Sequence, residues 1–173
     1  MALAAHDPTG HSAYRTGALA LLIAAASILT ALASQYLGGL QPCELCLEQR
    51  YAYYAGVPLL FLTLVALSAG QIRIATLLFV VVALTFFANT ALGIYHAGVE
   101  WRFWTGPAAC TGSQSLTTNA GGLLESLKQT NVVRCDEAAW RMFGLSMAGW
   151  NAIASLIIAF LCLRAANETL HTR

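Results

Sequence analysis

The chain has 173 residues, of which 58% are hydrophobic and 10% are charged, and its net charge is +1. Soluble domains carry about 25% charged residues, so this composition excludes an ordinary soluble protein and predicts one embedded in lipid. Without a basic stripe or a large positive charge, nucleic acid is excluded as an expected partner. We expect residues 1–173 to form a single domain, because no linker-like stretch divides them.

Four uncharged stretches are long enough to cross a bilayer as helices: residues 16–36, 51–69, 74–95 and 145–163. At a rise of about 1.5 Å per residue, each covers most or all of a hydrocarbon core roughly 30 Å thick. Pro58 in the second stretch does not argue against a helix there, because membrane helices tolerate proline. The expected fold class is therefore an all-α membrane protein, a four-helix transmembrane bundle.

Two polar loops, residues 37–50 and 96–144, carry four of the five cysteines. Four spans place both loops on the side of the membrane opposite the chain ends. Arginine is denser at the ends and in the turn at 70–73 than in the long loop, which favours cytoplasmic ends by the positive-inside rule. Paired cysteines persist as disulfides in oxidising compartments, so we expect both loops to face the periplasm or an equivalent exterior.

The second loop is too long for us to expect that all of it lacks structure. Leu123, Leu124 and Leu127 recur at helical spacing within residues 117–129. This spacing predicts a short amphipathic helix on the membrane surface, with a solvated, turn-rich loop as the alternative. The fifth cysteine, Cys162, has no partner within the last span, and we expect it to be a small buried hydrophobic residue.

Cys43 and Cys46 form a Cys-x-x-Cys pair at the end of the first loop. A disulfide of this kind exchanges readily when one sulfur is a stable thiolate, which a helix N-terminus or an adjacent cation stabilises. Pro42 suits the first turn of a helix, so the pair is expected to open the second membrane helix at its positive end. Arg50 follows Cys46 by four residues and would share its helical face. A redox-active dithiol is the favoured interpretation.

Two alternatives remain open for the cysteines. Cys110 and Cys135 are separated by 24 residues and could form a structural disulfide that stabilises the loop by roughly 3 kcal/mol. The Cys-x-x-Cys pair could instead be half of a zinc site, but no histidine stands at finger-like spacing to complete it. The competing hypothesis is thus a non-catalytic membrane protein with structural loop disulfides or a zinc site; no metal is expected under the redox interpretation.

Arg50 and His96 both lie where a predicted span meets a cysteine loop. Arg50 either extends to the lipid headgroups, or has a functional role in which it polarises a bound carbonyl or stabilises the Cys46 thiolate. His96 is either an ordinary interface residue or a ligand-contacting one. Because both residues are expected at the same membrane depth, they could line one pocket.

Residues 41–50, Gln-Pro-Cys-Glu-Leu-Cys-Leu-Glu-Gln-Arg, resemble the Pro-Cys-x-Leu-Cys-x-x-x-Arg signature of the disulfide bond formation protein B (DsbB) family. Four spans with the Cys-x-x-Cys pair first and the wider pair second agree with that family. So does the sequence from Cys135 through Trp140 into the last span. Epoxide reductases of vitamin K metabolism have a similar four-helix core, but in them the Cys-x-x-Cys pair follows the loop pair.

The resemblance implies a thiol oxidase of the bacterial inner membrane. Such an enzyme reoxidises a periplasmic thioredoxin-fold thiol oxidase by disulfide exchange and passes the electrons to a membrane quinone, either ubiquinone or menaquinone. Cys110 would form the mixed disulfide with this partner, and Cys135, once released, would attack Cys43. Cys46 would then pass electrons to quinone beside Arg50.

His96 is expected, by the same resemblance, to contribute to the quinone site. Its neighbourhood, residues 98–101, departs from the best-known members and resembles a subgroup of the family. There is a physical reason for placing such an enzyme in the membrane. The thioredoxin-fold oxidant has a potential near −120 mV, so its reoxidation requires a stronger acceptor, and quinone dissolves in the bilayer.

Overall fold

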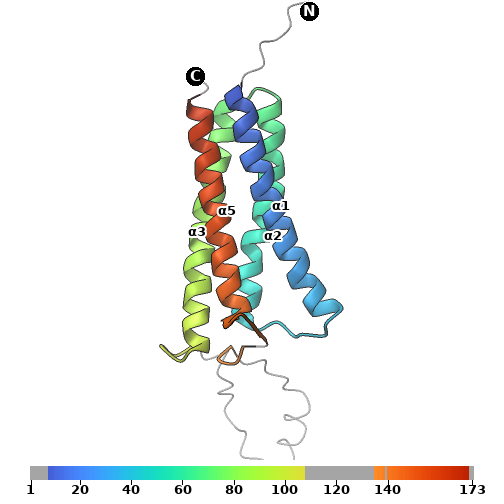
Figure 1. Ribbon diagram of the computed structural model, residues 1–173, viewed down its shortest axis with the longest axis vertical. Coiled ribbons are helices and arrows are strands. Elements are labelled where there is room, and N and C mark those ends of the chain that lie inside the picture. Colours follow the sequence, from blue (N-terminus) through green and yellow to red (C-terminus); the bar gives the residue numbers. More distant parts are fainter. Residues whose placement is uncertain (1–7, 108–134, 139, 172–173) are drawn as a thin grey trace, which may run out of the picture.

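The computed structural model describes residues 8–107, 135–138 and 140–171. These residues form four long helices: α1 (Pro8–Tyr36), α2 (Glu44–Ser68), α3 (Ile72–Glu100) and α5 (Met147–Leu170). All four are long and apolar enough to cross a membrane. The helices run alternately up and down in one bundle (Figure 1). The predicted four-helix transmembrane bundle is therefore confirmed.

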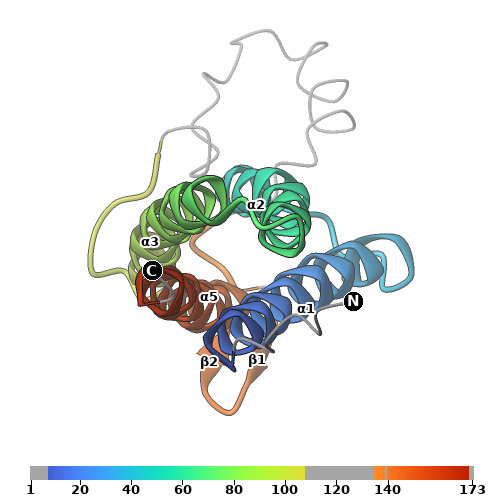
Figure 2. The same ribbon diagram turned by 90° about the horizontal axis from the view of Figure 1, so that it is seen from above.

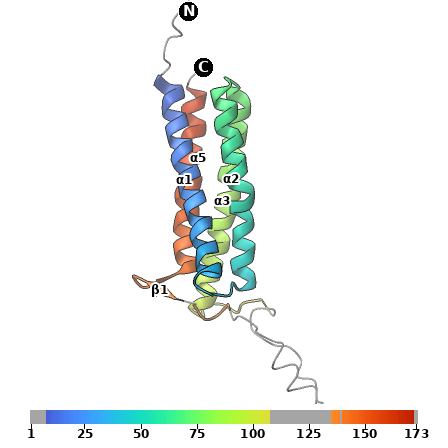
Figure 3. The same cartoon turned by 90° about the vertical axis from the view of Figure 1, so that its right-hand side faces the viewer.

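The helices are arranged as a ring in the order α1, α2, α3, α5 (Figure 2). The contact between α3 and α5 is the most extensive, followed by that between α1 and α5. The start of α1 and the end of α5 lie at the same end of the bundle as the short turn between α2 and α3 (Figures 1 and 3). The start of α2 with its N-cap Cys43, the end of α3 and the start of α5 lie at the other end, which we call the dithiol end.

Large apolar side chains cover the outside of the bundle. An exposed leucine or phenylalanine is tolerated singly in water, but a belt of them around four helices fits a lipid environment. The most exposed members come from every helix and include Leu22, Leu29, Phe61, Leu77 and Phe160, each with 59–69% of its surface accessible.

Each helix extends beyond the span that hydropathy predicted for it, and these extensions correct the predicted loops. Residues 44–50 and 96–100 were assigned to loops 37–50 and 96–144, but they form the first turns of α2 and the last turns of α3. Hydropathy marks where charges begin, whereas a helix continues until a capping or turn residue ends it. Arg50 and His96 are consequently helical residues.

Two short strands precede α5. The span was predicted to start at residue 145, but residues 145 and 146 form the second strand and the helix begins at Met147. Strand β1 (Arg141–Met142) pairs antiparallel with β2 (Leu145–Ser146) through a two-residue turn. Phe143 and Gly144 in this turn have φ angles of 54° and 81°, the left-handed conformation that tight hairpin turns require. Ser146 then caps α5 by accepting a hydrogen bond from the Gly149 backbone N–H. The predicted surface helix at 117–129 lies outside the described residues.

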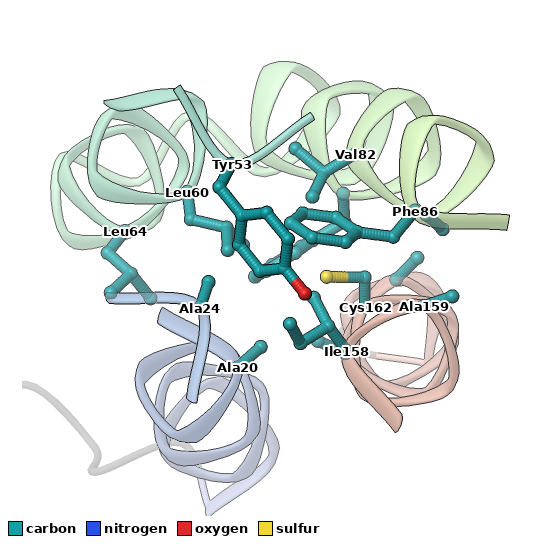
Figure 4. Packing of buried hydrophobic residues seen from close by; sticks show 14 residues of the cluster. Ala20, Ala24, Tyr53, Leu60, Leu64, Val82, Phe86, Ile158, Ala159 and Cys162 are labelled. Atoms are coloured by element: carbon teal, nitrogen blue, oxygen red, sulfur yellow. The ribbon is translucent and has the colours of Figure 1, made fainter. Parts of the chain in front are cut away.

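The core lies between the helices and is built from small residues facing large ones (Figure 4). A Cβ on Gly56 would lie 2.5 Å from the ring of Phe86, so only glycine lets α2 and α3 approach this closely there. Tyr53 meets the same phenylalanine edge-on, with ring centroids 5.1 Å apart. Cys162 is fully buried in this cluster, which agrees with its expected role as a small hydrophobic residue.

Candidate functional site

The Cys-x-x-Cys pair begins helix α2. Cys43 is the N-cap residue, and its sulfur accepts a hydrogen bond of 3.2 Å from the Cys46 backbone N–H. Glu44 lies in the first turn, where negative charge is favourable to the helix dipole. Both cysteines are free thiols. The structure thus places the pair at the N-terminus of the second helix, as the sequence predicts.

Cys135 lies in the same buried cluster as Cys43 and Leu45. It is disulfide-bonded, and its exposed fraction is 1%. Cys46, Leu92 and Tyr95 pack against this cluster from the side. The wider cysteine pair therefore has one member next to the Cys-x-x-Cys pair. Cys110 lies outside the described residues.

The two thiols of the Cys-x-x-Cys pair differ in how readily they lose a proton. A hydrogen bond to the Cys46 side chain and burial raise the pKa of the Cys43 thiol well above its usual range. Cys43 therefore keeps its proton and donates it toward Cys46, so that Cys46 is the sulfur that carries negative charge when the pair loses one proton. Burial has this effect because a thiolate loses its hydration.

His96 connects the dithiol to two other buried side chains. Its Nε2 atom lies 3.6 Å from the Cys43 sulfur and 3.8 Å from Oε1 of Glu100. Its Nδ1 atom lies 2.7 Å from Nε2 of Gln49. Since the Gln49 amide donates to Nδ1, the proton of the neutral imidazole resides on Nε2 and points toward the cysteine and the carboxylate.

A chain of hydrogen bonds extends from Gln49 into the middle of the bundle. Gln49 accepts from the Asn151 side-chain amide. Tyr53 donates to Asn151 over 2.6 Å and lies 3.2 Å from the Ser155 hydroxyl, to which Asn89 donates over 2.9 Å. Each polar group is satisfied, as burial in an apolar bundle requires. The chain fixes the orientation of Gln49 and, through it, of the imidazole.

Arg50 lies on the side of α2 that faces α1. Its guanidinium donates to the Gln35 side-chain oxygen, and a second nitrogen donates to the Ala31 carbonyl over 3.2 Å. These two contacts with α1 hold the guanidinium at the wall of the bundle. A fixed cation at this position is a ready partner for a polar atom of a bound molecule.

A cavity of about 500 Å³ lies beside the dithiol, between α1, α2 and α5. It exists because α1 leans away from α5 over its C-terminal half (Figure 1), where no residue after Ala24 is fully buried. Its size falls within the range of small-molecule sites. Its polar wall includes Cys46, Gln49, Arg50, Tyr53, His96 and Asn151, and most of its other lining residues are apolar, among them Ile23, Ile28, Leu40, Pro42, Trp140, Met142, Met147 and Trp150.

Arg50 and His96 line this one cavity together with Cys46. The sequence pointed to these three residues but missed Gln49, Tyr53 and Asn151. A signal existed for Tyr53 and Asn151, because polar residues inside a predicted span are costly unless they have a function or a partner, whereas Gln49 fell in a predicted loop. Their faces could not be read from hydropathy, so they could not be assigned to one site.

The sequence argument against zinc considered only histidines close along the chain. In the folded chain, His96 lies 53 residues after Cys43 and yet brings its ring nitrogen to the dithiol. The donor atoms of Cys43, Cys46 and His96 all lie within 4.8 Å of one another. Antiparallel packing of α2 and α3 therefore supplies a third donor that spacing along the chain did not indicate.

Comparison with known proteins places this geometry in a family. Residues 14–165 match the profile described as disulfide bond formation protein DsbB. The chain belongs to the DsbB family. It is 27% identical over 127 residues to a disulfide bond formation protein B of Xylella fastidiosa, covering 72% of this chain and 73% of that protein. It is also 26% identical over 148 residues to an uncharacterized protein of Rickettsia prowazekii, covering 83% and 82% of the two chains.

No solved structure matches the chain. Membership of the DsbB family makes the protein a multi-pass membrane oxidoreductase of disulfide bond formation. The resemblance inferred from residues 41–50 is thereby confirmed. The electron acceptor, the exchange partner and the role of each cysteine are separate questions, which the geometry of the site addresses.

Proposed function

We propose that the protein is a quinone-dependent thiol oxidase of the bacterial inner membrane. It takes electrons from the reduced form of a soluble, periplasmic thioredoxin-fold disulfide donor and passes them to ubiquinone or menaquinone. The chain ends are cytoplasmic and both cysteine connections face the periplasm. The observation that carries this proposal is the position of Cys46 on the wall of an apolar cavity that also presents Arg50 and His96.

The first half of the reaction is disulfide exchange at the dithiol end. A thiol of the soluble partner attacks the Cys110–Cys135 disulfide at Cys110, and Cys135 leaves as a thiolate. Cys135 then attacks Cys43 of an oxidised Cys43–Cys46 pair, and Cys46 leaves as a thiolate. The placement of Cys135 in the same buried cluster as Cys43 favours this route, because exchange needs direct approach of the two sulfurs. Reclosure of the loop disulfide and of the partner's disulfide leaves Cys43 and Cys46 reduced.

The second half removes two electrons and two protons from the Cys43–Cys46 dithiol. A quinone in the cavity would supply an acceptor for both. The cavity fits such a group, since an apolar space of this size is bordered by donors that suit a carbonyl oxygen. Arg50 would donate to one oxygen, held in place by Gln35 on α1. His96 presents its Nε2 proton at the dithiol and is held in that tautomer by Gln49.

The proposal is tested by substituting the sulfur nearest the acceptor. Purified Cys46→Ala is mixed anaerobically with a reduced thioredoxin-fold protein and a short-chain ubiquinone, and quinone reduction is followed by its ultraviolet absorbance. We expect no turnover, because no Cys43–Cys46 disulfide can form. Cys162→Ala is the matched control, since this cysteine is buried in the core away from the cavity, and it should turn over like the wild type.

Turnover by Cys46→Ala at the wild-type rate would refute the mechanism. The competing hypothesis, a membrane protein with structural disulfides, expects loss of stability without any quinone reductase activity in the wild type. Cysteine labelling with an impermeant maleimide in spheroplasts separates the two orientations. Labelling of Cys46 only after the inner membrane is permeabilised would place the dithiol in the cytoplasm and remove the periplasmic partner from consideration.

A further inference from the structure

Four donor groups, of which Cys46 is half-buried and the other three are buried, converge at the start of α2 and the end of α3. The sulfurs of Cys43 and Cys46 and a ring nitrogen of His96 lie within 4.8 Å of one another. The Glu100 carboxylate stands one helical turn beyond His96, with Oε1 3.8 Å from the same ring nitrogen that faces Cys43. Two thiols, one imidazole and one carboxylate form a donor set that suits a tetrahedral zinc ion.

Glu100 points to a ligand independently of the cysteines. Its side chain is only 5% exposed. Its Oε2 atom is fully buried and has no hydrogen-bond partner among the described residues. A buried carboxylate oxygen without a partner is costly, and a bound cation is one of the groups that satisfies it.

The spacing of the donors agrees with a shared metal. Zinc lies about 2.3 Å from sulfur and about 2.0–2.1 Å from imidazole nitrogen, so a tetrahedral site separates these two donors by about 3.5 Å. The observed distance from the Cys43 sulfur to Nε2 of His96 is 3.6 Å. The carboxylate, at 3.8 Å from the ring nitrogen, needs to approach by a few tenths of an ångström, which rotation of its side chain provides.

We propose that the reduced protein binds one Zn²⁺ through Cys43, Cys46, His96 and Glu100. Binding releases the two thiol protons to water. The imidazole proton moves from Nε2 to Nδ1, where the Gln49 amide turns its oxygen to accept it, and no electrons are transferred. The oxidised protein does not bind, because a disulfide offers no thiolate. The metal occupies the sulfurs that the proposed thiol oxidase needs, so zinc inhibits turnover. Binding itself rests on the donor geometry, and only the inhibition rests on the proposed function.

The direct test is a metal titration of the purified protein, reduced and then freed of reductant under anaerobic conditions. Co²⁺ serves as the probe, since a tetrahedral ion with thiolate ligands gives a charge-transfer band and strong d–d bands. We expect one equivalent to bind, Zn²⁺ to displace it, and the oxidised protein to give no band. Mg²⁺ should not compete. Cys110→Ala/Cys135→Ala should bind as the wild type does, because the site uses neither loop cysteine.

The role of the carboxylate is tested by Glu100→Gln. We expect zinc affinity to fall by at least about tenfold, the loss seen when a group supporting a metal is removed. Glu48→Gln is the matched control, because it removes the same charge from an exposed position on α2 and should change nothing. X-ray absorption at the zinc edge of the wild type provides a measure that needs no variant, with two sulfur and two nitrogen or oxygen ligands expected.

Equal affinity of Glu100→Gln and the wild type, a third sulfur ligand, or binding to the oxidised protein would each overturn the inference. Inhibition is measured separately, by quinone reductase turnover with and without added zinc. We expect micromolar zinc to slow the wild type reversibly, and Glu100→Gln to need at least about tenfold more. Turnover that ignores zinc would refute this inference alone, whereas absence of turnover without zinc would refute the proposed function.

Discussion

The two ends of the bundle use the same four helices in opposite ways. At the end that carries the chain termini, Ala20, Phe79, Cys162 and Ala165 are fully buried. A Cβ on Gly17 would lie 2.7 Å from the ring of Phe79, so this ring on α3 reaches across the core and packs directly against α1. At the dithiol end, α1 leans outward and leaves a cavity of about 500 Å³.

Polar side chains are distributed between the ends in the same way. At the end that carries the chain termini they make local contacts, such as the hydrogen bond of 2.7 Å between the Thr76 and Thr169 hydroxyls. At the dithiol end they form one connected series from His96 to Asn89. Tight apolar packing stabilises one end and leaves it chemically inert. The dithiol end is less tightly packed, and it contains a cavity lined by sulfur, imidazole and guanidinium groups.

The largest expected effect comes from breaking the packed end. Phe79→Ala removes a fully buried ring between α1, α2 and α3. We expect a loss of about 3–5 kcal/mol in the free energy of unfolding, measured by SDS titration in mixed micelles. Phe87→Ala is the matched control, since Phe87 is 36% exposed on the outside of the same helix and should cost much less. Similar losses for the two variants would contradict the described packing.

The second-largest effect is expected on quinone binding, and it compares Arg50 in the cavity with Arg73 at the opposite end of the bundle. Arg50→Gln removes a charged donor from the cavity wall. Hydrogen bonds from charged groups contribute about 1.5–3 kcal/mol, so we expect the KM for quinone to rise by about tenfold or more while the KM for the soluble thiol is unchanged. Arg73→Gln, an exposed arginine beside the α2–α3 turn, should have no effect on either value. Unchanged quinone dependence of Arg50→Gln would remove this residue from the site.

The buried hydrogen-bond series predicts a smaller effect on stability. Tyr53→Phe deletes one hydroxyl and leaves Asn151 without its donor. We expect a loss of about 1–2 kcal/mol in the same SDS titration, as for other buried groups whose partner is removed. Tyr54→Phe, with Tyr54 49% exposed, provides the comparison and should be neutral. If the two tyrosine variants unfold alike, the series does not contribute to stability.

Cys162→Ala should have the smallest effect. This cysteine lies in the packed end with no exposed surface, and losing its sulfur removes about as much apolar volume as one methylene group. We expect a cost of about 0.8 kcal/mol in stability and an unchanged kcat. A loss of activity larger than the loss of folded protein, measured by turnover per folded molecule, would show that the two ends are functionally coupled.

The sequence predicted the features that depend on position along the chain. Charge-free stretches located the four helices, and Pro42 before Cys43 located the start of the second one. Arg50 and His96 were expected at one depth because consecutive helices are antiparallel, and one cavity contains both. These predictions succeeded because membrane depth is a one-dimensional quantity that hydropathy measures directly.

Features that depend on which face a residue presents were not predicted. Gln49, Tyr53 and Asn151 come from two helices that are not consecutive, and hydropathy does not distinguish a lipid-facing side from a core-facing side. The outward lean of α1 was not predicted for the same reason, because the apolar residues of this helix are equally compatible with lipid, with the core and with a cavity. The helical extension to Glu100 was missed because charge was taken to end the helix.

One detail of the dithiol end links chemistry to backbone order. The Cys43 sulfur is both a reacting atom and the acceptor that caps the Cys46 backbone N–H. A helix cap contributes about 1 kcal/mol, so any bond that turns this sulfur toward another atom loosens the first turn of α2. The rate of amide hydrogen exchange at Cys46 would therefore change each time the Cys43 sulfur forms or breaks a bond. The order of the first turn of α2 would thus depend on the redox state of the dithiol.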